Sequence, residues 1–581
     1  MDFMEPVYTQ AAECQDCYKC LRRCPVKSIQ IQDGHARIMN ESCIMCGTCV
    51  RTCPAGAKKI RNDLQRARLL LNSRDKVYMS IAPSWRAEFE GSEDKLIAAV
   101  KKLGFAGVSE TALGAQEVSA NTAKILAEGK PGVYISSACP TVVEYVLKYM
   151  PKLAGSITGL LSPLLAHCKM LRKEYGDDIG IVFAGPCIGK KKESDTSEGL
   201  LDVAITFQDL KQWLNDEDID QGSLQPENGE DVFVPQRAAE GSLYPVDGGM
   251  IAGIKANCDV TDAGYMTFSG MDNIMQVLEG LENFKPDKPV FLELLACDGG
   301  CVNGPAAQSE KSSALKRLDV LSGSEYEKEN IPRKPGLDIT ASFTPEPKEE
   351  KKYPEHKIRE ALERVGKYRP EDELNCSGCG YDSCRQFAEA LLEGRAEESM
   401  CVSYMRQLAH KKADMLIKTM PGGVVIVDEK LEVVESNRRF ASMLGSDAEN
   451  LYEQVPGLEK AKIEKLLPNA DMFRRVIESL EQVLEKDVKI NNAVLHITVF
   501  TIEQGRLAGA FLQDITAPAV AKEQIINKAR NVIEKNLQTV QQIAYLLGEN
   551  ASDSEVILNS IVESFQTGSE ESQRGKDAHK E

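Results

Sequence analysis

The 581-residue sequence predicts a multidomain protein of the α/β class. Its length is far above that of one typical domain, so several cores joined by linkers are expected. Residues 77–340 mix short apolar runs with helical patterns, which is typical of α/β layers. The 18 cysteines form three groups: eight between Cys14 and Cys53, six between Cys139 and Cys301, and four between Cys376 and Cys401.

The composition predicts a soluble chain. No stretch approaches the roughly 18 apolar residues needed to cross a bilayer, and the N-terminus, MDFMEPVYTQ, lacks the basic start and apolar core of a secretory signal. The net charge of −18 disfavours nucleic acid and anionic lipid, because both would meet repulsion over most of the surface. We therefore expect a cytoplasmic protein that binds neither nucleic acid nor membranes.

The first 62 residues are basic, with nine Lys and Arg against six Asp and Glu, a net charge of +3. This patch could dock an acidic, ferredoxin-like electron carrier, or it could offset the negative charge of bound clusters. Because the cytoplasm keeps thiols reduced, the cysteines indicate metal ligation rather than disulfides.

The first cysteine group consists of two runs with the spacing C-x2-C-x2-C-x3-C-P, starting at Cys14 and Cys43. This is the spacing of bacterial two-cluster ferredoxins, in which the fourth Cys of each run serves the other cluster. Zinc is the alternative, but duplicated runs with trailing prolines disfavour it. Residues 1–62 are therefore predicted to be a ferredoxin-like domain with two [4Fe-4S] clusters, one held by Cys14, Cys17, Cys20 and Cys53 and one by Cys43, Cys46, Cys49 and Cys24.

Four cysteines of the second group lie on three short segments, residues 136–140, 185–193 and 295–301. Two of the three segments follow predicted strands in an α/β region, where loops at strand ends commonly build sites. The four cysteines could therefore converge on one cluster.

In order, the three segments resemble the signatures of [FeFe]-hydrogenases, TSCCPxW, MPCxxKxxE and MACxxGCxxGG. Upstream, Ala82-Pro-Ser-Trp-Arg86 and Glu110-Thr-Ala-Leu-Gly-Ala115 resemble segments that line the cofactor pocket of that family. The resemblance covers about residues 1–405. It implies a two-lobed α/β domain over residues 63–344 that holds the H-cluster, a [4Fe-4S] cube joined to a diiron unit with CO and CN ligands.

The resemblance also implies roles for individual residues. Lys190 would hydrogen-bond a cyanide ligand and Glu193 would complete its motif, while Pro83 and Ser84 would contact the cofactor. The cube would be bound by Cys139, Cys187, Cys297 and Cys301, and Cys301 would also bridge to the diiron unit.

Several departures from the family pattern bear on the rate. The first cysteine of TSCCP, which passes protons in the catalytic members, is Ala138 in this chain, and Asn121 stands where a carboxylate is expected. The methionine of MPC is Gly185, and the last signature continues as Val-Asn-Gly-Pro after Cys301. Because a proton relay needs titratable groups within hydrogen-bond reach, we expect slow turnover.

The third group has the spacing C-x2-C-x4-C-x16-C and consists of Cys376, Cys379, Cys384 and Cys401. Zinc remains an alternative on spacing alone. The spacing is similar to a feature of sensory [FeFe]-hydrogenases, and this resemblance favours a fourth [4Fe-4S] cluster, in a small helical domain over residues 353–405.

The C-terminal third reads as two strands, helices and three strands, at residues 424–427, 431–435, 487–490, 494–501 and 507–512. This order resembles an α+β PAS domain over residues 406–516. Residues 519–547 read as one long helix whose apolar residues keep heptad spacing, and the tail from residue 566 is charged and predicted to be disordered. The region 517–581 is therefore interpreted as a signalling helix of a homodimer followed by a tail; packing of that helix on its own PAS domain is the alternative.

Candidate linkers are the acidic, Pro-rich segment 215–244 and the charged run 345–354. The combined hypothesis is an enzyme of sensory type, with reversible H2 oxidation and proton reduction at low turnover and a redox signal relayed to the PAS domain. Its partners would be H2 and protons, hydrogenase maturation proteins and a downstream signalling protein. The alternatives are an iron-sulfur scaffold or electron-transfer protein without the diiron unit, and an ordinary catalytic hydrogenase paired with ferredoxin.

Overall fold

The computed structural model describes residues 4–226, 230–257, 263–323, 336–349, 351–478, 483–491, 493–516 and 531–536. The chain divides into two compact units, Met1–Glu397 and Glu398–Glu581. None of the described helices has the length and apolarity that a membrane span requires. Within the predicted helix 519–547, residues 531–536 are helical; the rest of it, and the predicted disordered tail, lie outside the described residues.

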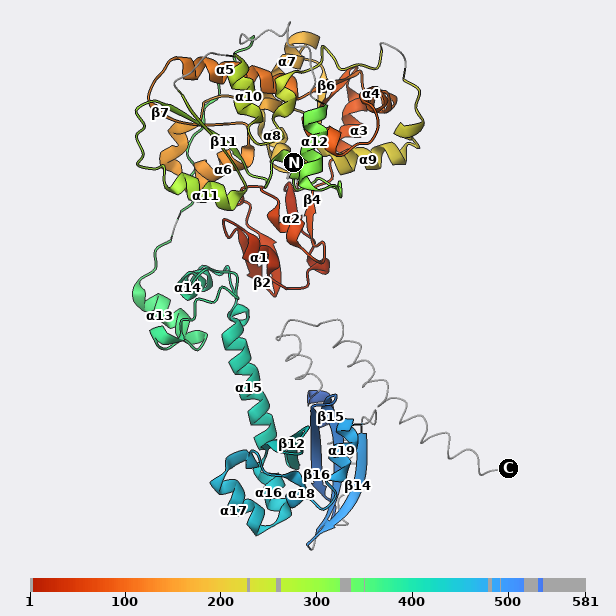
Figure 1. Ribbon diagram of the computed structural model, residues 1–581, viewed down its shortest axis with the longest axis vertical. Helices are drawn as coiled ribbons and strands as arrows, with labels where there is room; N and C mark the ends of the chain where they lie inside the picture. The colour runs from red at the N-terminus through yellow and green to blue at the C-terminus, as the bar shows by residue number, and fades with distance from the viewer. Residues whose placement is uncertain are drawn as a thin grey trace, which may run out of the picture. The chain divides into compact units, whose positions relative to one another are not determined.

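The N-terminal part of the first unit is built from two short antiparallel pairs (Figure 1). Each cysteine run contains a one-turn helix, α1 (Lys19–Arg23) in the first and α2 (Thr48–Thr52) in the second. The two helices are in contact. Leu21 and Ile31 are buried and fill the small core. The strand pairs are β1 (Val7–Thr9) with β4 (Lys58–Ile60), and β2 (Ile29–Gln32) with β3 (His35–Ile38).

The α/β prediction is confirmed by two parallel sheets in the first unit. Strands buried on both faces read as continuous apolar runs, as in residues 290–295. The four-stranded sheet has the order β6 (Gly107–Glu110), β5 (Val77–Ile81), β8 (Gly180–Gly185), β9 (Val203–Thr206). The three-stranded sheet has the order β10 (Gly264–Ser269), β11 (Pro289–Leu295), β7 (Gly132–Ile135).

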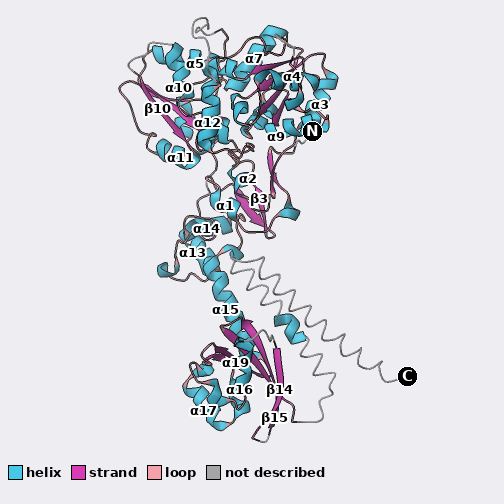
Figure 2. Ribbon diagram, turned by 45° about the vertical axis from the view of Figure 1, so that its right-hand side comes forward, coloured by secondary structure: helices cyan, strands magenta, loops and turns pink. Residues whose placement is uncertain are grey.

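Helices surround the strands of both sheets (Figure 2). Parallel neighbours need long crossover connections, and helices supply them. The bounds are α3 (Leu64–Ser73), α4 (Glu93–Lys102), α5 (Ala112–Ala127), α6 (Pro140–Tyr149), α7 (Pro163–Tyr175), α8 (Gly189–Thr196), α9 (Phe207–Asp216), α10 (Gly249–Asn257), α11 (Met271–Glu279) and α12 (Ser313–Ser322).

The prediction of a linker at residues 215–244 is wrong. Phe233 is buried and packs into the core of the four-stranded sheet, with its ring centroid 6.1 Å from that of Trp85. The N–H of Val234 donates to the carbonyl oxygen of Val108 at 2.9 Å. The segment therefore belongs to the domain, and its acidic, Pro-rich composition hid the few apolar residues that anchor it.

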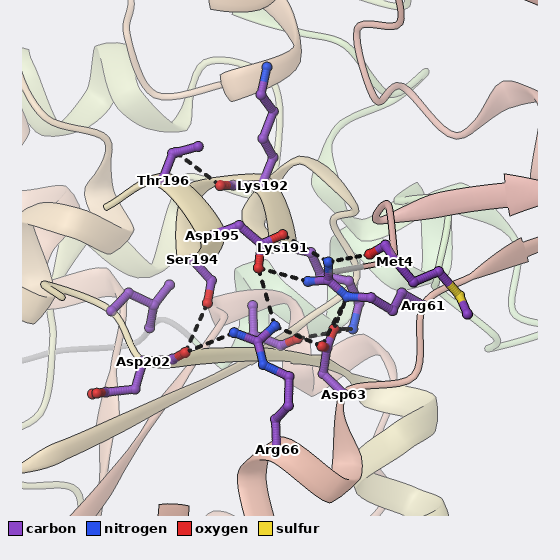
Figure 3. Close-up of polar contacts among 12 residues, drawn as sticks. Met4, Arg61, Asp63, Arg66, Lys191, Lys192, Ser194, Asp195, Thr196 and Asp202 are labelled. Atoms are coloured by element: carbon purple, nitrogen blue, oxygen red, sulfur yellow. Dashed lines mark hydrogen bonds and ion pairs between the residues drawn. The ribbon is translucent and has the colours of Figure 1, made fainter. Parts of the chain in front are cut away.

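A buried ion-pair network joins the end of the N-terminal part to α8 (Figure 3). The carboxylate of Asp63 accepts from Lys191 Nζ at 2.9 Å, from Arg61 Nε at 3.0 Å and from Arg66 Nη1 at 2.9 Å. Arg61 also donates to both carboxylate oxygens of Asp195, at 2.9 and 3.0 Å. The side chains of Asp63 and Lys191 are each 1% exposed, so this network is shielded from water.

Asp63→Asn is expected to lower the free energy of unfolding by about 3–5 kcal/mol at pH 7, because two buried cations lose their shared anion. Burial pushes the pKa of Asp63 up, but Lys191, Arg61 and Arg66 outweigh it and hold the pKa below its usual value. An acid with a depressed pKa stabilises the fold above its unfolded pKa, and this stabilisation is lost as pH falls through the folded value.

The midpoint of the urea transition measures this effect. The difference between the wild type and Asp63→Asn should shrink below about pH 4, where the unfolded carboxyl is protonated. The control is Asp216→Asn, which removes a surface partner of Arg68 and should cost about 0–1 kcal/mol. Equal midpoints for wild type and Asp63→Asn at pH 7 would contradict the account of the network.

The last part of the first unit contains α13 (Glu355–Arg364) and α14 (Cys384–Leu392), which pack on each other. Ile358 and Leu362 of α13 meet Cys384 and Ala388 of α14 in a small core. Helix α14 begins at Cys384, where the Ser383 hydroxyl oxygen accepts from the N–H of Gln386 at 3.1 Å.

The second unit begins before α15 (Val402–Thr419) and contains a five-stranded antiparallel sheet. Its strands overlap all five predicted ranges, in the order β13 (Val433–Ser436), β12 (Gly423–Asp428), β16 (Leu507–Asp514), β15 (Ala493–Glu503), β14 (Val483–Ile490). Between β13 and β14 the chain forms α16 (Arg438–Leu444), α17 (Ser446–Gln454), α18 (Ile463–Leu466) and α19 (Asp471–Glu478).

Candidate iron-sulfur and cofactor site

All three predicted site segments follow parallel strands, one more than the sequence patterns indicated. Cys139 comes shortly after β7 and is the N-cap of α6, while Cys187 follows β8. Cys297 and Cys301 follow β11. Loops at the carboxyl ends of parallel strands are a usual place for a binding site.

The four cysteines line one apolar cavity, Cys139, Cys187, Cys297 and Cys301. Burial raises the pKa of the Cys187 thiol to about 11, and the neighbouring thiol of Cys139 adds to the rise. Burial likewise raises the pKa of Cys297, with Cys301, Cys187 and Cys139 adding to it. The structure brings together the four residues predicted to bind the cube.

This donor set fits a bound iron-sulfur group. Free thiolates are unfavourable in so apolar a cavity, whereas a metal replaces the thiol protons and neutralises the charge. Soft thiolates are the ligands that iron-sulfur clusters take in proteins.

Ser84 gives a second observation in favour of a bound group. It lines the same cavity, it is 1% exposed, and its hydroxyl oxygen has no hydrogen-bond partner among the described residues. A buried hydroxyl without a partner costs about 1–3 kcal/mol. An acceptor atom on a bound group would remove this cost. Pro83 lines the cavity beside it.

Lys190 and Glu193 lie one turn apart on α8, but only Lys190 lines the cavity. Glu193 Oε2 accepts from Lys190 Nζ at 2.8 Å and from the Ser162 hydroxyl at 3.0 Å. Glu193 therefore fixes the position of the Lys190 ammonium group and does not itself line the cavity.

Ala138 lines the cavity and presents only a methyl group there. Its N–H donates to the Ser136 hydroxyl at 3.2 Å, which fixes the loop. Asn121 donates to the carboxylate of Glu117 at 3.1 Å. Neither Ala138 nor Asn121 can carry a proton, because neither side chain titrates.

Sequence reasoning missed Glu293. This carboxylate lies on β11, is 1% exposed and accepts from the N–H groups of Met250 and Ile251 at 3.2 and 3.3 Å. Burial raises its pKa to about 7, and it is among the groups that raise the pKa of Cys301. In the sequence, the signal that could have identified Glu293 was the presence of a single carboxylate within the otherwise apolar run 290–295.

The eight N-terminal cysteines also fall into groups. Burial raises the pKa of Cys49, and the thiols of Cys46, Cys43 and Cys24 add to it. These four are the set predicted for the second cluster. For Cys20, burial raises the pKa against the opposing effect of Lys58, and Cys17 and Cys14 act on it as well. Cys53, the fourth residue predicted for the first cluster, is the C-cap of α2.

The second cysteine run forms part of the wall of the cavity, to which Met45 and Cys46 contribute. Gly47 has a φ of +70°, and a Cβ there would lie 2.3 Å from Pro305 Cβ, so only glycine allows this approach. Lys148 Nζ donates to the carbonyl oxygen of Cys43 at 3.0 Å. The predicted second cluster and the cavity therefore adjoin.

The third cysteine group is divided between the two units. Cys376, Cys379 and Cys384 belong to the first unit, and Cys401 is the N-cap of α15 in the second. Cys168 is fully buried in the core of the four-stranded sheet, and Cys258 lies outside the described residues.

Three family profiles match parts of the chain. Residues 75–305 match the C-terminal domain of the iron-only hydrogenase large subunit, residues 6–54 match a 4Fe-4S dicluster domain, and residues 372–403 match an Fe-S cluster family. The periplasmic [Fe] hydrogenase large subunit of Nitratidesulfovibrio vulgaris is 25% identical over an alignment of 277 residues, and the match covers 39% of this chain and 64% of that protein. The chain therefore spans just under two thirds of the length of that relative.

Two solved structures are also similar to parts of the chain. An apo form of a variant [FeFe]-hydrogenase from Chlamydomonas reinhardtii is 17% identical and covers 49% of this chain and 99% of its own, with a TM-score of 0.39. A PAS domain of an HTR-like protein from Haloarcula marismortui is 14% identical and covers 19% of this chain and 99% of its own, with a TM-score of 0.15.

Proposed function

We propose that this chain, an [FeFe]-hydrogenase-like protein with a dicluster domain, oxidises H2 and reduces protons slowly in the cysteine-lined cavity and signals through its C-terminal part. The observation that carries the proposal is the convergence on one apolar cavity of four cysteines and of the Ser84 hydroxyl, which has no hydrogen-bond partner among the residues that the structure describes. The adjoining second cysteine run supplies a route for electrons.

The cavity would hold the H-cluster, which supplies the chemistry of H2 cleavage when it is bound. Cys139, Cys187, Cys297 and Cys301 would bind its [4Fe-4S] cube, and Cys301 would also bridge to the diiron unit with CO and CN ligands. Ser84 and Lys190 would donate hydrogen bonds to cyanide, because one is an unpartnered donor and the other a fixed cation. Apolar lining keeps water out and strengthens both contacts.

Slow turnover follows from Ala138. A titratable group within hydrogen-bond reach of the reacting atoms contributes about 10²–10⁴-fold to a rate, and a methyl group contributes nothing of this kind. A protein that keeps all of its cofactor ligands but turns over slowly is better suited to sensing H2 than to consuming it in bulk.

The output would pass through residues 406–516, as a PAS domain. Helix α15 starts at Cys401, and its last turn is tied to the sheet because Asn437 Nδ2 donates to the carbonyl oxygens of Ile417 and Gly422, both at 2.9 Å. Asn437 is fully buried and its Oδ1 accepts from the N–H groups of Val424 and Phe440. A change at Cys401 would therefore reach the sheet through helix α15 and these Asn437 contacts.

The remaining assignments belong to the same proposal. The third cysteine group would hold a [4Fe-4S] cluster, maturation proteins would insert the diiron unit, and a ferredoxin-like carrier would exchange electrons. The chain would act in the cytoplasm as a homodimer that contacts a downstream signalling protein.

Dye reduction tests the proposed activity. Anaerobically matured full-length protein should reduce oxidised methyl viologen slowly under H2, and Cys301→Ser should abolish the reaction. A wild-type chain that reduces no dye, when a control hydrogenase matured in the same host does, would contradict the proposal and favour a cluster scaffold.

Ser84→Ala is expected to shift a cyanide stretching band in the infrared spectrum of the matured protein, because cyanide loses a hydrogen-bond donor. The control is Ser109→Ala, which removes a buried hydroxyl bonded to His167 at 2.8 Å and outside the cavity lining. Its bands should match those of the wild type. If the bands of Ser84→Ala also stay unchanged, Ser84 does not contact the cofactor.

A further inference from the structure

The loop that carries Cys376 and Cys379 packs directly on the first cysteine run. Arg22 of α1 bridges the two, because its Nη2 donates to the carbonyl oxygen of Cys17 at 2.8 Å and its Nη1 to that of Gly378 at 3.4 Å. Both carbonyls belong to loops with predicted cluster ligands. One guanidinium group thus joins the two cysteine loops.

The approach of the two loops depends on glycine. Gly380 has a φ of +95°, and a Cβ there would lie 2.9 Å from Leu21 Cγ, next to Arg22 on α1. A side chain at this position would separate the loops.

Further contacts extend the junction along the N-terminal part. The N–H of Ile31 donates to the carbonyl oxygen of Arg395 at 2.9 Å, and Lys27 Nζ lies 3.4 Å from a carboxylate oxygen of Asp382. The junction therefore involves backbone, charged and apolar groups from several elements.

Tyr381 lies inside this junction and is 3% exposed. Its ring centroid lies 5.9 Å from that of Phe387 on α14. Its hydroxyl has no hydrogen-bond partner among the described residues. The hydroxyl is therefore available to donate to a group bound at this junction.

The N-terminal part thus contacts the cavity on one side and the third cysteine group on another. The second run meets the cavity through Cys46, and the first run meets Gly378 through Arg22. We propose that electrons released in the cavity reach the third group through the dicluster domain, from the second cluster to the first and then across the Arg22 and Tyr381 junction.

This route rests on the proposed function and specifies the order in which the clusters would be reduced. Oxidation of one H2 releases two protons, which leave to water, and two electrons. Each four-iron cluster would take one electron and pass it on when it reduces the next. One of the two electrons would come to rest on the cluster of the third cysteine group, here called the third cluster, and the other on a cluster of the dicluster domain. Cys401, the fourth residue of its predicted ligand set, begins the helix that leads to the sheet of the second unit.

A kinetic experiment on the matured full-length protein tests the route. The electron paramagnetic resonance signal of the third cluster is identified as the signal lost in Cys376→Ser/Cys379→Ser. In Cys14→Ser/Cys17→Ser, which removes the first cluster, H2 should reduce the third cluster at least tenfold more slowly than in wild type, while dithionite should still reduce it. Equal rates under H2 in this variant and wild type would overturn the route.

A second measurement needs neither that variant nor the diiron unit. In dithionite-reduced wild type, the third cluster should show a spin–spin interaction with the first. Arg22→Ala should weaken this interaction, whereas Arg23→Ala, which changes the exposed neighbour on α1, should leave it intact. Two independent signals, or no paramagnetic third site because zinc occupies it, would overturn the route.

The two tests separate the route from the proposed function. A chain without H2 activity that keeps the spin–spin interaction contradicts the proposed function and supports the junction between clusters. A chain that reduces dye under H2 but shows no interaction contradicts the route alone.

Discussion

Ala138→Cys is expected to raise the rate of H2-dependent dye reduction by about 10²-fold, the lower end of what a positioned acid–base group contributes. Ala138 lines the cavity beside Cys139, so the new thiol would face the reacting atoms. A thiol has a usual pKa near 8.5 and exchanges protons at neutral pH, which a methyl group cannot do. The measurement is the viologen rate per bound diiron unit.

The matched control for this gain is Ala115→Cys. Ala115 also lines the cavity, but it lies on α5 and not in the cysteine loop. The thiol introduced at position 115 should leave the rate unchanged within a factor of about two, because it is not at the relay position. If Ala138→Cys turns over no faster than the wild type, the missing cysteine is not what makes this chain slow.

Cys297→Ser is expected to remove the cube and the diiron unit joined to it. We expect a loss of about six iron atoms per matured chain, four from the cube and two from the diiron unit, and of all H2-dependent activity. Cys297 is buried among Cys301, Cys187 and Cys139, and a serine oxygen is a harder ligand than iron-sulfur clusters prefer. Iron analysis and the dye assay measure the two effects. The N-terminal clusters should remain, because their ligands are unchanged.

The matched control here is Cys168→Ala, which alters a cysteine that is fully buried in the core of the four-stranded sheet. It should keep the full iron content and cost only the stability of a small cavity. A Cys297→Ser chain with undiminished iron would contradict the assignment of the cube to this cavity.

Local patterns predicted the local structure well. The cysteine runs fix their own tight turns, and apolar runs such as residues 290–295 identify buried strands before any tertiary contact is known. The convergence of the three cysteine loops was also within reach, because carboxyl ends of parallel strands share an edge. The five strands of the second unit were also predicted from local patterns, namely the alternation of apolar residues and the turns between them.

Long-range contacts could not be predicted in this way. The contact of Arg22 with Gly378 joins residues 356 positions apart, and no local pattern encodes it. The packing of Phe233 was hidden by its acidic surroundings, and Glu293 was masked by the apolar run that contains it. The Ser84 hydroxyl has no hydrogen-bond partner among the described residues, and this can be recognised only when the neighbouring donors and acceptors are placed in three dimensions.

Infrared absorption of the anaerobically matured protein, recorded under H2 and then under CO, tests the central claim most directly. The account predicts CO and CN stretching bands that shift between the two gases, because a diiron unit with these ligands would sit in the cavity lined by Ser84, Lys190 and the four cysteines. If no such bands appear after maturation that succeeds on a control hydrogenase, the cavity does not hold an H-cluster and the hydrogenase function is wrong.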